Sequence, residues 1–200
     1  MKLEVKTFVG PDVAPYRDDL ARLRIRVFRD FPYLYEGAMD YEAHYLQRYL
    51  DCSECIFVLV FDGEMVVGAS TALPMEYEVG EFTAPFVREG YEIGKIFYFG
   101  ESVLLPEYRG QGLGHRFFDE REAFARELGR FNLTTFCAVE RPEDHPLKPV
   151  DYRPHDVFWG KRGYAKHPEL ATTFEWQDVD QPVETAHPMV FWTREIQAIG

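Results

Sequence analysis

The chain has few of the features that mark nucleic-acid-binding, membrane or secreted proteins. Its 200 residues carry 22 lysines and arginines against 34 aspartates and glutamates, a formal net charge of −12. This charge disfavours nucleic acids and anionic membranes as partners. No apolar run approaches the roughly 18 residues of a membrane-spanning helix, and the opening MKLEVKTFVG lacks the apolar core of a signal peptide. We therefore expect a cytoplasmic protein.

Cysteine and metal-site patterns are also scarce. Three cysteines do not make a disulfide framework. Cys52 and Cys55 form one isolated C-x-x-C pair between a predicted helix and a predicted strand, where neither a redox site nor a zinc site is expected. His145, His155 and His167 are irregularly spaced, so we expect no metal. No G-x-S-x-G sequence occurs, which disfavours a hydrolase of that type.

What the chain does have is a large apolar content and one well-marked local unit. With 46% apolar and 16% aromatic residues, it can bury a substantial core. Its length suits one domain spanning residues 1–200. The local unit covers residues 95–129. A β-branched and aromatic run, Ile96 to Leu105, predicts a strand. Pro106 ends it, and a helix with a regular apolar stripe follows as far as Gly129.

Three glycines, Gly110, Gly112 and Gly114, join this strand to this helix. Glycine lets the backbone N–H groups approach a ligand closely, and a helix N-terminus adds unpaired N–H groups and a positive dipole end. The turn therefore predicts an anion site for a phosphate or pyrophosphate. The glycine spacing differs from the G-x-G-x-x-G dinucleotide pattern, and the Gly-Lys-Ser/Thr of nucleotide triphosphate loops is absent.

This turn resembles the acetyl-CoA loop of the GNAT N-acetyltransferases, whose pattern is Gln/Arg-x-x-Gly-x-Gly/Ala. Residues Arg109-Gly110-Gln111-Gly112-Leu113-Gly114 match each fixed position, and Val103 to Tyr108 resembles the strand end and turn that precede it. The resemblance implies acetyl-CoA as cosubstrate, without a metal. The residues expected to hold acetyl-CoA are Val103, Leu104, Leu105, Arg109, Gly110, Gln111, Gly112, Leu113, Gly114 and His115.

The other predicted elements follow the order of the GNAT fold over essentially the full length. That order implies a single α/β domain, with a mixed, mostly antiparallel sheet of about seven strands flanked by about four helices. In sequence, we predict a strand over Leu3–Val9, helices over Val13–Phe31 and Asp40–Leu50 with Asp40 as N-cap, strands over Ile56–Phe61 and Glu64–Leu73 joined at Asp62-Gly63, a connector over Pro74–Gly94 with a turn of helix after Pro85, a strand over Asn132–Val139, a loop over Glu140–Asp156, a helix over Val157–Gly163, and antiparallel strands over Ala171–Gln177 and Met189–Ile196.

The reaction of the family transfers an acetyl group to an amine, which must be neutral to attack. An amine with a pKa near 10.4 is neutral in only about one molecule in a thousand at pH 7, so a general base helps. Glu101 is the only carboxylate in the predicted central strand, and we expect it to be this base unless an ion pair occupies it. Many relatives place their glutamate where this chain has Tyr98, so Tyr98 or a water chain stays an alternative. Trp159 stands where many relatives have an acidic tyrosine, which leaves the general acid unassigned.

The acceptor pocket of the family borders the link between the first two helices. The resemblance therefore implies substrate contacts from Tyr33, Tyr35, Glu36 and Tyr98. Residues 31–55 and 74–94 each carry five acidic side chains and one basic one. Charge of one sign around a pocket concentrates the opposite charge. We thus expect a cationic acceptor, such as a polyamine, an aminosugar or a basic peptide end. The alternative is that these acids only keep the surface soluble.

Two other functions remain open at this point. The resemblance implies direct transfer from acetyl-CoA to a primary amine in a ternary complex. Because Trp159 replaces the usual tyrosine, a second hypothesis is a non-catalytic regulatory protein that binds CoA or acyl-CoA. A third hypothesis is an interaction protein whose glycine turn binds nothing. The sequence does not identify the amine, and a homodimer stays possible.

Overall fold

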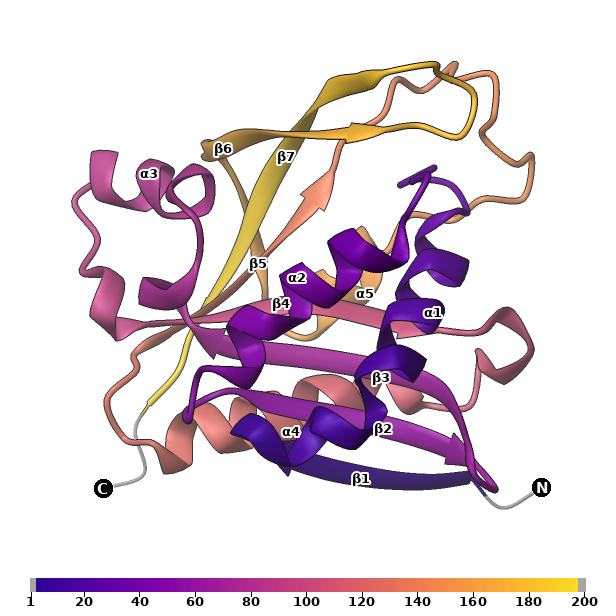
Figure 1. Cartoon of the computed structure of the whole chain (residues 1–200). Helices are drawn as coiled ribbons and strands as arrows, with labels where there is room; N and C mark the ends of the chain where they lie inside the picture. Colours follow the sequence, from indigo (N-terminus) through magenta and orange to yellow (C-terminus); the bar gives the residue numbers. More distant parts are fainter. Residues whose placement is uncertain (1–2, 198–200) are drawn as a thin grey trace.

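The computed structural model describes residues 3–197, in which seven strands form one sheet in the order β1-β2-β3-β4-β5-β7-β6 (Figure 1). Neighbouring strands are antiparallel except β4 and β5, which are parallel. This confirms the predicted α/β fold with a mixed, mostly antiparallel sheet. The strands are β1 (Leu3–Val9), β2 (Ile56–Asp62), β3 (Met65–Pro74), β4 (Ile96–Leu104), β5 (Leu133–Val139), β6 (Ala165–Gln177) and β7 (Glu184–Glu195).

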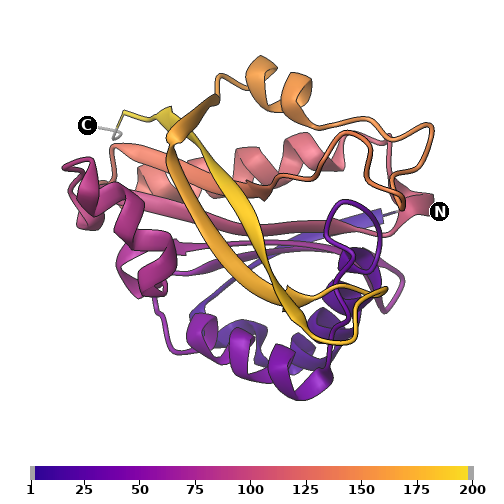
Figure 2. The same ribbon diagram turned by 90° about the horizontal axis from the view of Figure 1, so that it is seen from above.

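Five α-helices lie in the described range, one more than expected, and they cover the two faces of the sheet. Seen from above, α1 and α2 lie on one side of the sheet and α4 on the other (Figure 2). None of the helices between residues 3 and 197 is long and apolar enough to cross a membrane. The helices are α1 (Arg17–Phe28), α2 (Met39–Leu50), α3 (Gly80–Arg88), α4 (Leu113–Glu127) and α5 (Asp156–Lys161).

Each face of the sheet has its own hydrophobic core. Along β2, Phe57, Leu59 and Phe61 pack into the core under α1 and α2, whereas Val58 and Val60 pack into the core under α4. Successive side chains of a strand point to opposite faces. A central strand covered on both sides is therefore continuously apolar, which is the pattern of residues 56–61.

Three predictions for the first two helices and the connector were wrong in detail. The helix predicted from Val13 begins at Arg17, because residues 10–16 form a 3₁₀ segment whose Pro15 has no N–H for an α-helical bond. Asp40 makes no capping hydrogen bond, and the N-cap of α2 is Ala38. The connector contains the full helix α3, which runs through Pro85. Phe86 of α3 packs 4.9 Å from the ring of Phe191, and such tertiary packing stabilises a short helix that its sequence alone does not indicate.

The sheet opens at its centre. β4 and β5 pair only where residues 96–98 face residues 133–135, and beyond that point the two strands diverge (Figure 1). β4 also contains a bulge. Ser70 of β3 faces Ser102 and Ala72 faces Phe99, so Thr71 alone faces both Gly100 and Glu101. The bulge lies beside the opening, which is where a β-bulge can re-aim a side chain.

Candidate active site

The bulge in β4 decides where the Glu101 side chain points. Tyr98 lies on the face of the sheet covered by α1 and α2, and strict alternation would send Glu101, three residues on, to the other face. The extra residue restores the parity, so Glu101 and Tyr98 line the same cavity. Gly100 permits this geometry, because a Cβ there would lie 2.1 Å from the Tyr49 hydroxyl.

Arg121 of α4 holds the bulge from the opposite face. Its guanidinium is 1% exposed and donates hydrogen bonds to the carbonyls of Thr71 (3.2 Å) and Glu101 (3.1 Å) and to the Ser102 hydroxyl (2.9 Å). No carboxylate pairs with it among the described residues, and burial lowers the pKa of Arg121 to about 10. A buried guanidinium bonded to neutral carbonyls is costly. Its hydrogen bonds nevertheless join α4 to the backbone that carries Glu101.

Arg24 of α1 fixes one oxygen of Glu101 and leaves the other free. Its Nη1 lies 2.6 Å from Glu101 Oε2, and its Nε donates to Glu42 Oε2 at 2.5 Å. The guanidinium also stacks over the Tyr45 ring, 3.9 Å from the centroid. The side chain of Glu101 is only 2% exposed, and its Oε1 has no hydrogen-bond partner in residues 3–197. A buried carboxylate oxygen without a donor suggests that a ligand group supplies one.

A chain of hydrogen bonds leads away from Glu101 through α2. The Tyr45 hydroxyl donates to Glu101 Oε2 (3.0 Å) and accepts from the Tyr49 hydroxyl (3.0 Å), and Glu78 Oε1 lies 3.4 Å from the Tyr49 oxygen. Burial raises the pKa of Tyr45 and of Tyr49, so both stay protonated at neutral pH. Burial also raises the pKa of Glu78, although the Arg48 guanidinium beside it acts in the opposite direction.

These residues surround a cavity of about 110 Å³ beside the opening between β4 and β5. Tyr33, Tyr35 and Tyr98 line it together with Glu101, so the structure brings together four of the five residues predicted for catalysis and substrate binding. Glu36 is outside the lining and forms an exposed, two-pronged ion pair with Arg29. The rest of the lining is contributed by Arg24, Phe28, Tyr41, Tyr45, Arg48, Phe82, Gly100, Cys137, Phe174, Trp176 and Met189.

Most of these lining residues could not be found from the sequence. Trp176 shows why, because it reaches the connector between α1 and α2 from the far end of the chain. Its indole N–H donates to the Tyr33 carbonyl at 2.9 Å. Arg141 reinforces this junction, donating to the carbonyls of Pro32 and Tyr33 and forming a paired bond with Asp178 at 2.7 Å.

The acidic residues of segments 31–55 and 74–94 do not border the cavity, although the prediction of a cationic acceptor required them there. None of the ten lines the cavity. Glu42 and Glu78 are buried behind it and are paired with Arg24 and Arg48, whereas Glu54 and Glu76 share Arg130 on another surface. The only carboxylate that lines the cavity is Glu101.

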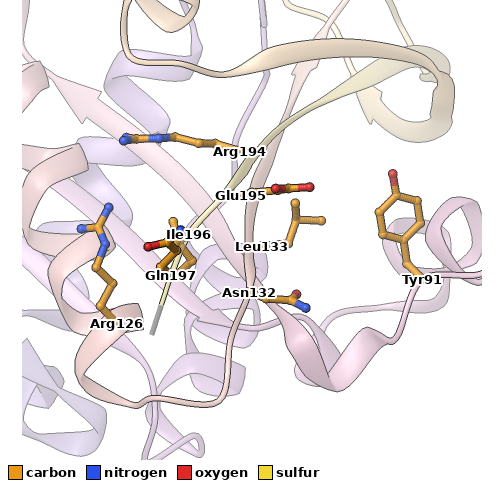
Figure 3. A pocket seen from close by; sticks show the side chains of 8 residues that line it. All are labelled: Tyr91, Arg126, Asn132, Leu133, Arg194, Glu195, Ile196 and Gln197. Atoms are coloured by element: carbon orange, nitrogen blue, oxygen red, sulfur yellow. The ribbon is translucent and has the colours of Figure 1, made fainter. Parts of the chain in front are cut away.

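A wider hollow of about 720 Å³ lies elsewhere, where the N-terminal end of β5 meets the C-terminal end of β7 (Figure 3). No residue predicted for catalysis or binding lines it. Its two cations, Arg126 and Arg194, both pair with the buried carboxylate of Glu122. Both cations of the larger hollow are therefore already paired, and its one carboxylate, Glu195, is exposed. The smaller cavity, with the buried Glu101, is the better candidate for chemistry.

The glycine turn has the features of an anion cradle. Gly110 and Gly112 have φ of +78° and +79°, and a Cβ on either would meet no atom within 4 Å. In residues 3–197, the backbone N–H groups of residues 110–114 donate no hydrogen bond. Residues 109–112 are exposed, and α4 begins directly behind them. The turn therefore fits the pyrophosphate of a CoA-type ligand, as its sequence predicts.

The other expected cofactor residues surround this turn. Leu104 ends β4 and Leu105 follows it, both half-buried, while Val103 and Leu113 are buried. The Arg109 side chain folds back and donates to the Leu104 carbonyl, so it is not directed at a ligand. Gln111 donates weakly to the Tyr108 carbonyl (3.4 Å). His115 lies against Phe158, and its Nδ1 is 3.3 Å from Arg162.

Trp159 and the cysteines occupy structural positions. The Trp159 ring packs 4.9 Å from Phe136 and 5.2 Å from Trp192. Cys137 forms a 3.2 Å hydrogen bond with Tyr98 in the cavity wall. Cys55 is buried and donates to the Tyr49 carbonyl, as expected of an ordinary thiol at a helix end.

Comparison with solved structures identifies the class of fold. The chain is similar over 98% of its length to all of a GNAT-family acetyltransferase from Streptococcus pneumoniae, with a TM-score of 0.60 and 12% identity. It is similar over 99% to all of Arabidopsis thaliana NAA60, solved with a bisubstrate analogue, with a TM-score of 0.64 and 8% identity. A ribosomal-protein-alanine N-acetyltransferase from Brucella melitensis gives 0.60 at 10% identity, covering 96% of this chain and 99% of that one.

These identities are low, so the likenesses show the fold alone. The family follows from a family model. Residues 20–148 match the acetyltransferase (GNAT) family. This is more than half of the chain, and the protein belongs to that family. No match is found to a curated protein sequence.

Proposed function

We propose that this acetyltransferase moves an acetyl group from acetyl-CoA to a cationic primary amine, with residues 1–200 acting as one domain. The observation that carries the proposal is the free Oε1 of Glu101, buried in an aromatic cavity beside the opening between β4 and β5. A proton acceptor is thereby placed where an amine can enter. Structurally similar proteins named as acetyltransferases support the same reaction class.

The glycine turn supplies the cofactor side of the proposal. Acetyl-CoA, when bound, supplies the acetyl thioester. The free N–H groups of residues 110–114 would hold its pyrophosphate, and the exposed turn admits it without rearrangement. Val103 to Leu105 would border the remainder along β4, with His115 at the start of α4. The net charge of −12 makes this backbone contribution more important, since few side-chain cations face the turn.

Glu101 would then remove a proton from the bound ammonium. Arg24 holds Oε2, and Oε1 accepts the proton. The neutral amine forms the amide C–N bond and the thioester C–S bond breaks. The nitrogen gives up its second proton to solvent, and the departing thiolate takes one proton. Trp159 is a very poor acid and packs against apolar rings, so we assign that proton to solvent.

Direct transfer is favoured over an acyl-cysteine intermediate. Cys137 is the only thiol in the cavity lining. Burial raises the pKa of Cys137 to about 12, although the Tyr98 hydroxyl bonded to it acts in the opposite direction. A thiol that is neutral at pH 7 is a weak nucleophile. The amine itself is the better attacking group.

Glu101→Gln tests the proposal. The amide keeps the shape but removes the base, so kcat with the best amine should fall about 10²–10⁴-fold, while CoA affinity by calorimetry stays within about twofold of wild type. Glu64→Gln, on the exposed β2–β3 turn, is the matched control and should be fully active.

Three outcomes would contradict the proposal in different ways. Full activity of Glu101→Gln between pH 6 and 9 would move the base elsewhere, with a water chain at Tyr98 next in line. CoA binding by the wild type without turnover of any amine would favour a regulatory protein. A wild type that binds no CoA would leave the glycine turn without a cofactor role.

A further inference from the structure

The cavity that holds Glu101 has mainly aromatic walls. Nine of its fifteen lining residues are aromatic. Tyr41 is 46% exposed and Tyr35 and Phe174 are half-buried, so these side chains border the entrance, whereas Phe82 and Tyr98 are buried deeper. Aromatic faces attract a cation as well as an apolar chain, so the walls suit an ammonium group and the carbon atoms behind it.

The polar groups in these walls are already bonded within the protein. Arg24 pairs with Glu101 and Glu42, and Arg48 pairs with Glu78. Tyr98 is bonded to Cys137, and the Trp176 indole N–H donates to the Tyr33 carbonyl. At the entrance, Tyr41 is exposed and Tyr35 is half-buried beside Glu42. A ligand deep in the cavity therefore finds few free partners.

One partner does remain. Four buried side-chain atoms in residues 3–197 lack a hydrogen-bond partner, and of these only Glu101 Oε1 belongs to the cavity lining. Within the cavity wall Arg24 is shared between Glu42 and Glu101, and it bonds Glu101 only through Oε2. A bound ammonium would donate to the free oxygen, Oε1.

We infer that the acceptor carries its primary ammonium on an apolar arm, as in a long-chain alkylamine, and that polyhydroxylated amines such as aminosugars are excluded. The inference rests on the proposed function and narrows its acceptor class. Each hydroxyl buried without a partner costs roughly a tenfold to hundredfold loss of affinity. An arm of methylene groups incurs no such cost. The rest of the acceptor molecule, whether polar or apolar, can stay outside the entrance.

A pair of amines that differ only in hydroxyl groups tests this. Hexylamine and glucamine share a six-carbon arm, and only glucamine carries hydroxyls along it. With wild-type protein and saturating acetyl-CoA, we expect kcat/KM for hexylamine to exceed that for glucamine by about 100-fold or more. Equal rates, or a preference for glucamine, would overturn the inference while leaving the acetyltransferase activity intact.

Binding without turnover separates the two proposals. By calorimetry, hexylammonium should bind the wild type and the Glu64→Gln control equally, and the Glu101→Gln variant at least tenfold more weakly. 1-Hexanol, which lacks the charge, should bind all three equally weakly. If this pattern holds although no amine is acetylated, the site assignment stands and the enzymatic proposal fails. Equal binding of hexylammonium by wild type and Glu101→Gln overturns the site assignment.

Discussion

At the scale of single residues, the arrangement around Arg24 shows what the sequence could and could not predict. A carboxylate in the apolar central strand was visible, and Glu101 is indeed buried. The sequence did not predict which face of the sheet Glu101 occupies, because the bulge that reverses the alternation depends on Thr71 and Arg121 across the sheet. It did not predict the ion-pair partner of Glu101 either, because Arg24 has the pattern of an ordinary helix residue until packing brings it to Glu101.

Arg24→Met tests the importance of this arrangement for stability. The change removes the only cation between two buried carboxylates, and breaking a buried ion pair from one side typically costs about 3–5 kcal/mol. We expect the free energy of unfolding in urea to fall by about that amount. Adding Glu42→Gln should recover part of the loss, since one carboxylate no longer lacks a partner. A loss below about 1 kcal/mol would show that Arg24 contributes little.

At the scale of elements, the strand, glycine turn and helix were predicted well because their signals are local. Apolar alternation, Pro106, the glycines and the helical stripe lie within 35 consecutive residues, and β4 and α4 begin and end close to the predicted positions. Helix α3 depends instead on contacts with distant segments, such as that between Phe86 and Phe191, and only a turn of it was predicted. The first six residues of β6, before Ala171, were also missed.

Gly112→Asp tests the turn as a cofactor cradle. The substitution places a negative side chain beside N–H groups expected to face a pyrophosphate, so CoA affinity measured by calorimetry should fall at least 100-fold. Gly63→Asp is the matched control, because Gly63 has a similar φ of +62° and equally open surroundings at an unrelated turn. It should be strained to the same degree but bind CoA normally. Equal affinities in the two variants would remove the turn from the cofactor site.

At the scale of the whole molecule, the buried thiols predict how stability changes with pH. Burial raises the pKa of Cys55 and of Cys137 to about 12, from about 8.5 in an unfolded chain. Between these values a thiol loses its proton only on unfolding, so stability falls as pH rises above about 8.5. Each thiol contributes a slope of up to about 1.4 kcal/mol per pH unit.

Urea unfolding at pH 8, 9 and 10 measures this slope. The Cys137→Ala variant starts from a lower stability because a buried group is removed, but its stability should fall less steeply with pH than that of the wild type. Other titrating groups act equally on both proteins, so the difference between the two slopes isolates the thiol. Parallel pH curves for variant and wild type would show that Cys137 does not titrate on unfolding.

The cavity also has an order of assembly along the chain. Trp176 and the Tyr33 carbonyl, 143 positions apart, are joined by one hydrogen bond, and Phe174 and Met189 complete the same wall. A growing polypeptide leaves the ribosome from its N-terminus, and domains generally fold as they emerge. The glycine turn at residues 110–114 is therefore synthesised well before the wall of the cavity can be completed. A nascent chain halted after residue 163 would contain this turn but would lack Phe174, Trp176 and Met189 of the cavity wall.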